Sequence, residues 1–386
     1  MDTSFDDLRP YLPHEIPPAM QRIAASDYFP DMARFIFPER EIEDVRRMVS
    51  NLRTTHEFQM QVMCDFVRSV LNRSVRRLTF GGLHHLHPDR QYLFIANHRD
   101  IVLDSSLMLY VFHCNSLPIT EISFGSNLMV SQLIIDIGKS NKMYTVRRSG
   151  NLRELYEHSL RLSRYLRHAI IVRGESIWIA QRNGRTKDGN DLTDQGIIKM
   201  FCMSRIADPV HALMELNVIP VAISYQIEPC DILKTRELYA SRDGKKYIKQ
   251  PGEDLHSVLT GILQPKGDIH LQICPPLSGE ELLAIAGDSP NEFYRKTAAL
   301  IDTRIWEACK LHDNNYIAHD LRSGADTYAT RYTPEALAEF ETRYRQMLHE
   351  ITGDESVLRK IFLGIYANPV DNKLNILKQG ISHGHC

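Results

Sequence analysis

The sequence predicts an α/β fold: a mixed, mostly parallel sheet flanked by helices, with helical additions before and after it. Between about residues 77 and 273, short apolar runs of strand length alternate with helical stripes. This alternation is typical of sheets that carry helices on both faces. Before and after that region apolar residues recur mainly at helical spacing, and 386 residues are too many for one simple core.

These patterns divide the chain into three parts. We expect an N-terminal helical subdomain over residues 1–77, an α/β domain over 78–284 and a C-terminal helical segment over 285–386. Six prolines between residues 10 and 38 indicate short helices broken by turns. From residue 41 to 73 the apolar residues fall on helical stripes, such as Val45, Met48, Val49 and Leu52.

Strand candidates in the middle part are short apolar runs bounded by turn signals. They cover residues 77–81, 91–96, 142–146, 169–172, 176–180, 218–225 and 268–273. Helical stripes are expected over about 152–166 and 194–206, between these runs. Residues 241–252 are rich in charge and glycine and predict an exposed hairpin or insertion.

The C-terminal segment returns to helical spacing. A helix is expected over residues 291–312, and Thr333 is a plausible N-cap with Pro334 at the first helical position. A last helix follows and is expected to end at Asn368-Pro369.

Composition narrows the class of protein. The seven cysteines are scattered without a CxxC pair and no secretory leader precedes them, which indicates reduced thiols and a cytoplasmic protein. No segment approaches about 18 uninterrupted apolar residues, so any membrane contact is expected to be peripheral.

Residues 94–106 hold the most informative stretch. An apolar run ends at Asn97-His98, and Asp100 and Asp104 follow. Parallel sheets place ligand crevices at such strand ends. A carboxylate beside His98 would fix its tautomer and stabilise its cation, as a general base requires. The alternative is an ordinary histidine in a strand-to-helix turn.

Basic residues concentrate between positions 139 and 187, where they outnumber acidic residues by nine although the whole chain has a net charge of −2. Such a cluster favours an anionic ligand, and the arginine fork suits phosphate. Arg147-Arg148 and the pair Arg182 and Arg185 each follow an apolar run, as His98 does, so they could gather at the same edge of the sheet. Aromatic residues are not interleaved with them as a stacking platform, so nucleic acid is the weaker interpretation.

Four features in order resemble the glycerolphosphate acyltransferase family, which includes glycerol-3-phosphate and lysophosphatidate acyltransferases. Asn97-His98 with Asp104 looks like its first block, and the strand ending at Arg147-Arg148 looks like its second. Asn183-Gly184-Arg185 stands where the third block is expected, and Ile219-Pro220-Val221 fits the fourth. The blocks span roughly residues 94–224.

The resemblance implies an acyltransferase-like αβα fold and an O-acyltransferase of phospholipid biosynthesis. An acyl group would pass from acyl-CoA or acyl carrier protein to the hydroxyl of glycerol-3-phosphate or a lysophospholipid. His98 would be the general base and Asp104 its partner. The acceptor would be bound by Arg147, Arg148, Asn183, Gly184 and Arg185. No metal or cofactor is expected, and the protein would lie peripherally on the inner face of the cell membrane.

The sequence departs from the family pattern at three points. Five residues instead of four separate His98 from Asp104, which leaves Asp100 as a rival partner. Asn183 replaces the third-block glutamate, and Arg185 directly follows the glycine. Two alternatives therefore stay open: a non-catalytic phospholipid or membrane-surface binding protein that keeps the fold, and a metal-dependent phosphohydrolase that uses His98, Asp100 and Asp104.

Overall fold

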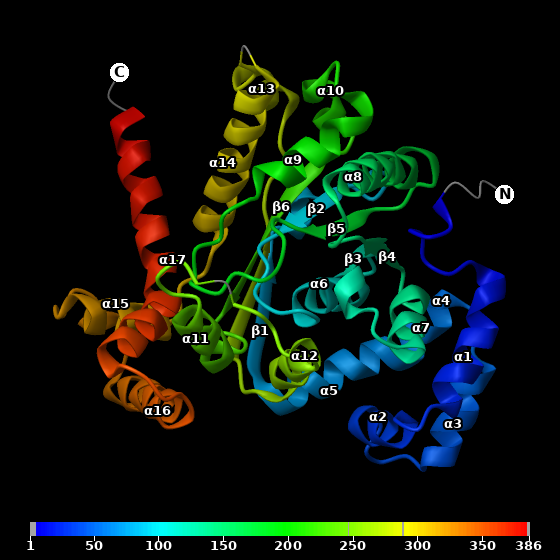
Figure 1. Cartoon of the computed structure of the whole chain (residues 1–386), viewed down its shortest axis with the longest axis horizontal. Helices are drawn as coiled ribbons and strands as arrows, with labels where there is room; N and C mark the ends of the chain where they lie inside the picture. The colour runs from blue at the N-terminus through cyan, green and yellow to red at the C-terminus, as the bar shows by residue number, and fades with distance from the viewer. Residues whose placement is uncertain (1–4, 246, 288, 384–386) are drawn as a thin grey trace.

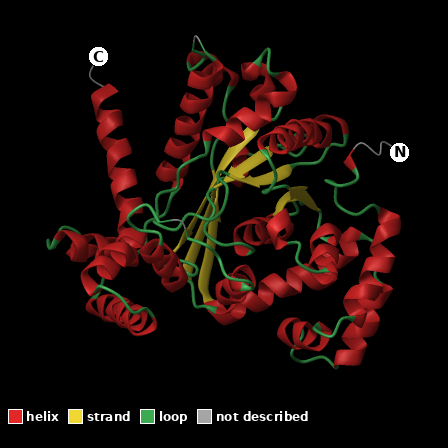
Figure 2. Cartoon of the chain, viewed as in Figure 1, coloured by secondary structure: helices red, strands yellow, loops and turns green. Residues whose placement is uncertain are grey.

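A seven-stranded sheet runs through the centre of the computed structural model, which describes residues 5–245, 247–287 and 289–383 (Figures 1 and 2). The strand order is β1-β7-β6-β2-β5-β3-β4. Pairing is parallel throughout except between β6 and β7, so β1 and β7 run opposite to the other five strands. The strands are β1 (Val75–Gly81), β2 (Leu93–Ala96), β3 (Glu121–Gly125), β4 (Met143–Val146), β5 (Ile177–Ala180), β6 (Val218–Tyr225) and β7 (Gly267–Ile273). The mixed, mostly parallel sheet flanked by helices is therefore confirmed.

Helices cover both faces of the sheet. The helices of this part of the chain are α6 (Leu103–Cys114), α7 (Gln132–Ser140), α8 (Leu152–Arg167), α9 (Gln195–Cys202), α10 (Pro209–Met214), α11 (Asp231–Ala240), α12 (Glu253–Leu263), α13 (Gly279–Ala284) and α14 (Pro290–Ala308). One core lies between the sheet and α8, α9 and α14, around residues such as Leu162, Phe201 and Ile301. The other lies between the opposite face and α5 and α6, around Val70 and Leu107. Strands β2, β5 and β6 thus bury side chains in both cores.

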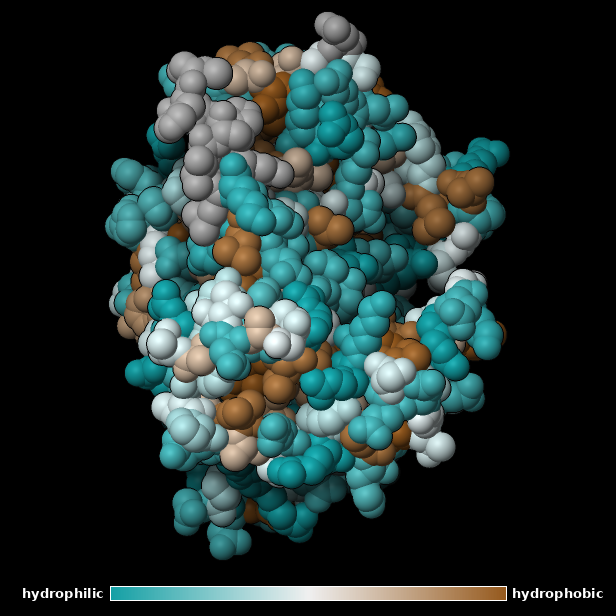
Figure 3. Space-filling model, turned by 90° about the vertical axis from the view of Figure 1, so that its left-hand side faces the viewer, coloured by the Kyte–Doolittle hydropathy of each residue, from teal (hydrophilic) through white to brown (hydrophobic). Residues whose placement is uncertain are grey.

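Helical additions stand at both ends of the chain. The N-terminal helices are α1 (Ile16–Ala25), α2 (Phe29–Ile36), α3 (Ile42–Asn51), α4 (Thr55–Phe58) and α5 (Cys64–Ser74), and α1 to α4 share a core of their own. The C-terminal helices are α15 (Asp313–Ser323), α16 (Pro334–Glu350) and α17 (Glu355–His383), which pack with α11. The side of the molecule that carries α15 to α17 is mainly hydrophilic, with small hydrophobic patches (Figure 3).

Six of the predicted strands are present within two residues of their expected bounds, but one was missed and one is wrong. β3 was missed because Glu121 breaks its apolar pattern; the buried Glu121 carboxylate is paired with Arg173 at 2.7 Å. Residues 169–172 are not a strand but part of a π-helical turn, His168–Val172, that continues α8. A short apolar run does not distinguish a buried strand from a helix end.

The predicted stop at Asn368-Pro369 is also wrong, because α17 continues through Pro369 to His383. Proline cannot donate to the carbonyl four residues earlier, here that of Ile365. Gly189 packs against that carbonyl so closely that a Cβ on Gly189 would lie 2.2 Å from the oxygen. The Asn368 side chain donates to Asp188 O at 2.7 Å. The loop that contains Asp188 and Gly189 therefore packs on α17 at the position of the proline.

Other local expectations can be compared with the structure directly. Thr333 caps α16 by accepting from the amide of Ala336, as predicted. In their described part, residues 241–252 form a largely exposed connection between α11 and α12 without a strand, so of the two expected forms the segment is an insertion and not a hairpin. Among the described residues, no helix combines the length and apolar character needed to cross a bilayer.

Candidate active site

His98 lies just beyond the carboxyl end of β2, between β5 and β6. All four residues of β2 are buried, which makes the strand a rigid support. Asn97 then continues the pairing with its side chain: its amide nitrogen donates to Ile223 O at 2.9 Å, and its oxygen accepts from Ile223 N at 2.8 Å. The backbone therefore leaves the sheet at a fixed position and presents His98 at the sheet edge.

The His98 imidazole is paired with Asp104, in the first turn of α6. His98 Nδ1 lies 2.9 Å from Asp104 Oδ2, and the aspartate is fully buried. The same oxygen accepts from the backbone amides of Arg99 at 2.7 Å and Asp100 at 2.9 Å. Its other oxygen accepts from the Tyr225 hydroxyl at 2.8 Å. These donors compensate the burial of the carboxylate and hold it against the imidazole.

Asp100 has a different position. Its Oδ1 accepts from the amides of Val102 at 2.9 Å and Leu103 at 2.8 Å, so this carboxylate caps the start of α6. Its other oxygen faces Gly261 of α12, where a Cβ would lie 2.2 Å away. Of the two carboxylates that the sequence left open, Asp104 is the one that contacts His98.

A network of buried charges holds the turn that carries His98. Arg99 is 5% exposed and is paired with Asp191 at 2.5 Å and Glu228 at 2.9 Å. Lys234 pairs with Glu228 and donates to the Arg99 carbonyl at 2.8 Å. Burial opposes the charge on Arg99, but the two carboxylates overcome it and raise the arginine pKa. Arg99 therefore stays charged across the ordinary pH range.

Arg185 lies beside the same turn. The backbone amide of the next residue, Thr186, donates to the carbonyl of His98 at 2.7 Å. The Arg185 side chain is 8% exposed, yet one of its terminal nitrogens, Nη1, has no hydrogen-bond partner among the described residues. A buried guanidinium with an unused N–H donor favours an anionic partner.

Arg147, Arg148, Arg182 and Asn183 meet in a pocket of about 220 Å³ at the same edge of the sheet. It lies between the carboxyl ends of β3, β4 and β5 and the helices α8 and α9. Three of the four strand-end arginines are therefore together, whereas Arg185 is not among the residues that line this pocket and lies beside the His98 turn. Gly184 adopts a left-handed φ of +77° between Asn183 and Arg185, a conformation that suits glycine.

Arg148 and Arg182 are half-buried and make no ion pair within the described part of the chain. Burial lowers the pKa of Arg148, against an opposing effect of Asp254. The guanidinium lies over Gly125, where a Cβ would be 2.8 Å from Arg148 Nε. Arg147 is exposed and contacts His158. A partly desolvated, unpaired cation favours an anionic ligand over a structural role.

Two aromatic residues of the site were not predicted. Trp178 packs its ring edge-to-face with His98 at a centroid distance of 6.1 Å, and Tyr225 supports Asp104. Tyr225 closes a strand parallel to β2, so the strand-end signal that selected His98 also applies to it. Trp178 carries no such signal, because it lies inside a buried strand.

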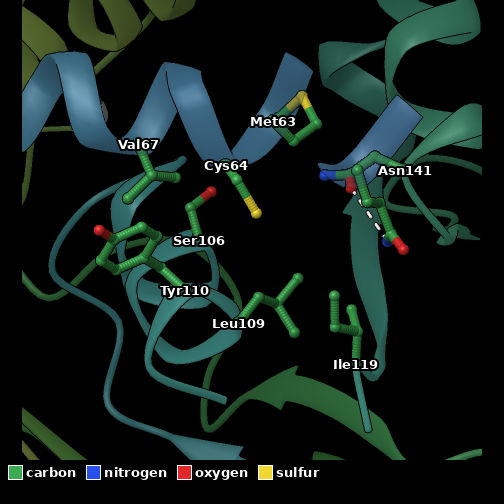
Figure 4. Close-up of a pocket in the computed structure, with 9 residues that line it drawn as sticks. Met63, Cys64, Val67, Ser106, Leu109, Tyr110, Ile119 and Asn141 are labelled. Atoms are coloured by element: carbon green, nitrogen blue, oxygen red, sulfur yellow. Dashed lines mark hydrogen bonds between the residues drawn. The ribbon is translucent and has the colours of Figure 1, made fainter. Parts of the chain in front are cut away.

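A second, smaller pocket of about 30 Å³ lies between α5 and α6 (Figure 4). Its walls are mainly apolar and include Cys64, Leu109 and Ile119, and a hydrogen bond of 3.2 Å joins Gln59 to Asn141 at its rim. It has room for about one water molecule and none of the predicted site residues lines it.

Within the described ranges, no group of three or more His, Cys, Asp or Glu side chains is arranged to hold a metal ion.

Comparison with known proteins gave matches among solved structures. No family model matches the sequence, and no curated protein matches it. The 1-acyl-sn-glycerophosphate (LPA) acyltransferase PlsC from Thermotoga maritima is similar in structure, with 13% sequence identity and a TM-score of 0.37. The match covers 76% of this chain and 97% of that one.

Proposed function

We propose that this protein is an O-acyltransferase that moves a fatty acyl group from the thioester of acyl-CoA or acyl carrier protein to an acceptor hydroxyl. The acceptor is glycerol-3-phosphate or a lysophospholipid. The observation that carries the proposal is the His98–Asp104 pair at a strand end, with unpaired arginines at the same edge of the sheet.

The pair supports general-base chemistry on an external hydroxyl. In the described part of the chain, no serine, threonine or cysteine side chain hydrogen-bonds to the His98 ring. Because Asp104 holds Nδ1, Nε2 is the nitrogen that meets the acceptor hydroxyl. The base would take the hydroxyl proton as oxygen attacks the thioester carbonyl, and Asp104 would stabilise the imidazolium. The C–S bond then breaks, and the proton passes from His98 to the leaving thiolate.

The arginines would bind the acceptor phosphate. Arg148 and Arg185 each have donor capacity that the described residues leave unused. A phosphate bound by such a cation would position the acceptor hydroxyl near the base, and positioning of this kind can supply much of the rate enhancement. The mechanism uses no metal, and the donor is a substrate rather than a bound cofactor. The cytoplasmic location at a membrane surface belongs to the same proposal.

The test is a thiol-release assay with purified protein, labelled long-chain acyl-CoA or acyl carrier protein, and a panel of acceptors. Stoichiometric thiol and labelled ester are expected with a phosphorylated glycerol or a lysophospholipid, and not with the same acceptors lacking a free hydroxyl. Tight binding of the lipids without thiol release would instead support a non-catalytic lipid-binding protein.

A further inference from the structure

The last helix, α17, packs on the loop that connects β5 to α9, which we call the β5–α9 loop (residues 181–194). The Asn368 side chain donates to Asp188 O at 2.7 Å, and the Asn372 side chain donates to Asn190 Oδ1 at 3.3 Å. Asn368 and Asn372 are four residues apart on α17, so they contact the loop from the same side of the helix. The helix itself packs against α11, α14 and α15 (Figure 1).

A proline of the helix and a glycine of the loop fit each other between these two contacts. Pro369 has no N–H to donate to the carbonyl of Ile365, one turn earlier in α17. Gly189 lies against that carbonyl: a Cβ on Gly189 would be 2.2 Å from the oxygen and 3.1 Å from Pro369 Cδ. Gly189 also has a left-handed φ of +80°. A larger residue at this position would therefore push the loop away from α17.

The same loop contacts the turn that holds His98. The backbone amide of Thr186 donates to the carbonyl of His98 at 2.7 Å. Further along the loop, Asp191 Oδ2 accepts from the Asn97 side chain at 3.2 Å. The segment that packs on α17 lies between these two contacts in the sequence, so its position bears on both.

Helix α17 also reaches the network of buried charges around the His98 turn. The Tyr366 hydroxyl donates to Asp231 Oδ2 at 2.7 Å and accepts from the backbone amide of Glu228 at 3.2 Å. Glu228 is one of the two carboxylates that pair with Arg99. Two separate sets of contacts therefore join the last helix to the candidate active site.

The residue of the loop that matters most for binding is Arg185. One of its terminal nitrogens is buried without a hydrogen-bond partner among the described residues, so no protein acceptor fixes that donor in place. Its position depends on the backbone that carries it. Displacement of a binding group by about 1 Å can cost on the order of 10²-fold in rate, so support from outside the site is needed to hold the group.

We propose that α17 is a positioning element of the candidate active site. Asn368, Pro369 and Asn372 hold the β5–α9 loop and thereby place Arg185 for an anionic acceptor. These α17 residues act through the loop and do not contact the acceptor. The inference rests on the proposed function for the role of Arg185, but the stability of the loop can be measured without any turnover.

Two variants separate the loop from α17, and each has a matched control. Gly189→Ala is compared with Gly324→Ala, because Gly324 has a similar φ of +72° but a Cβ there would meet no atom within 4 Å. Asn368→Leu removes the donor to the loop and also the acceptor of a bond from Arg322 at 2.9 Å. Its control, Arg322→Leu, removes the second contact and leaves the first. Circular dichroism checks folding, and Asn368→Leu carries the test if Gly189→Ala does not fold.

Hydrogen–deuterium exchange of the full chain without substrate reports on the loop. Peptides that cover residues 181–194 and the His98 turn should exchange about tenfold faster in the two test variants than in the wild type, because the loop opens more often. The two controls should exchange in these peptides as the wild type does. Equal exchange in test variants and controls would overturn the proposal, whatever the acyl-transfer assay shows.

Titration calorimetry with glycerol 3-phosphate and with lysophosphatidate gives the functional readout. We expect Kd for the bound acceptor to rise about tenfold or more in both test variants and to stay unchanged in the controls. KM for the acyl thioester should not change, which a general loss of stability would not explain. Faster exchange with an unchanged Kd would overturn the proposal, as would a wild type that binds neither acceptor. Binding that depends on α17 without acyl transfer would overturn the proposed function alone.

Discussion

Asp104 Oδ2 accepts from His98 Nδ1 at 2.9 Å across a strand-to-helix turn, while Asp100, closer in sequence, faces the backbone of α6 instead. Asp100 caps the start of α6, and Asp104 holds the His98 imidazole. This division of roles gives two aspartates in the same buried site with different expected sensitivities to substitution.

Asp104→Asn should reduce kcat on the order of 10²–10⁴-fold, because an amide can present its NH₂ group to Nδ1 and stabilise the wrong tautomer. Asp100→Asn should change kcat by less than about tenfold, since the asparagine oxygen still caps α6. Steady-state kinetics of the two variants, with circular dichroism to confirm folding, make the comparison. A larger loss of kcat in the Asp100 variant would contradict the assignment of Asp104 as the partner of His98.

Arg148→Ala should raise KM for a phosphorylated acceptor about 10–100-fold, the effect expected when one charge-assisted hydrogen bond to the phosphate is lost. Because Arg148 makes no ion pair within the described residues, its removal should leave the unfolding midpoint unchanged. Arg153→Ala, on the exposed side of α8, is the matched control for charge. Unchanged KM in the Arg148 variant would exclude Arg148 from the acceptor site.

Arg99→Met should destabilise the fold by about 3–5 kcal/mol, because it leaves Asp191 without its cation and weakens the pairing of Glu228 inside the protein. The control is Arg153→Met. Arg153 is 89% exposed in its pair with Glu157, so its loss should cost less than about 0.5 kcal/mol. Urea unfolding of both variants measures the difference. Equal stabilities would show that the buried network does not support the turn.

Stability should also depend on pH through Asp302. Burial raises its pKa to about 6, against the hydrogen bonds from Thr193. The folded protein therefore binds a proton more tightly than the unfolded chain, and this group's contribution falls as pH rises from about 4 to 6. Asp302→Asn keeps an acceptor for Thr193 without the charge.

At pH 4 the Asp302 variant and the wild type should have similar free energies of unfolding. At pH 7 the variant should be more stable by about 2–3 kcal/mol, which corresponds to a shift of roughly two pKa units. Urea titrations at both pH values test this. A difference that is the same at pH 4 and pH 7 would argue against a raised pKa in the folded state.

The sheet and the position of His98 could be predicted because both follow from local patterns. Apolar runs of strand length are read directly from the chain, and parallel strands bring their carboxyl ends to one edge. The same rule correctly placed Arg147, Arg148 and Arg182 in one pocket. The rule did not predict that Arg185 would lie apart from the other three arginines. The loop after β5 carries Arg185 beyond the pocket, to the turn that holds His98.

What the sequence could not predict depends on contacts between distant segments. Glu121 occupies a buried strand because Arg173 and Tyr165 satisfy its carboxylate, and both lie more than 40 residues away. Pro369 stays within α17 because a glycine loop packs on the free carbonyl of Ile365. The choice between Asp100 and Asp104 likewise depends on how the turn folds, which residue spacing does not determine.

The proposed role of His98 is to remove the proton of the acceptor hydroxyl. The variant His98→Gln tests this role in a single-turnover assay that follows labelled ester from a bound acyl thioester and acceptor. Glutamine can still contact Asp104 but cannot act as a base near neutral pH. We expect the rate of ester formation to fall on the order of 10²–10⁴-fold, with the unfolding midpoint and acceptor binding unchanged. Ester formation at the wild-type rate would contradict it.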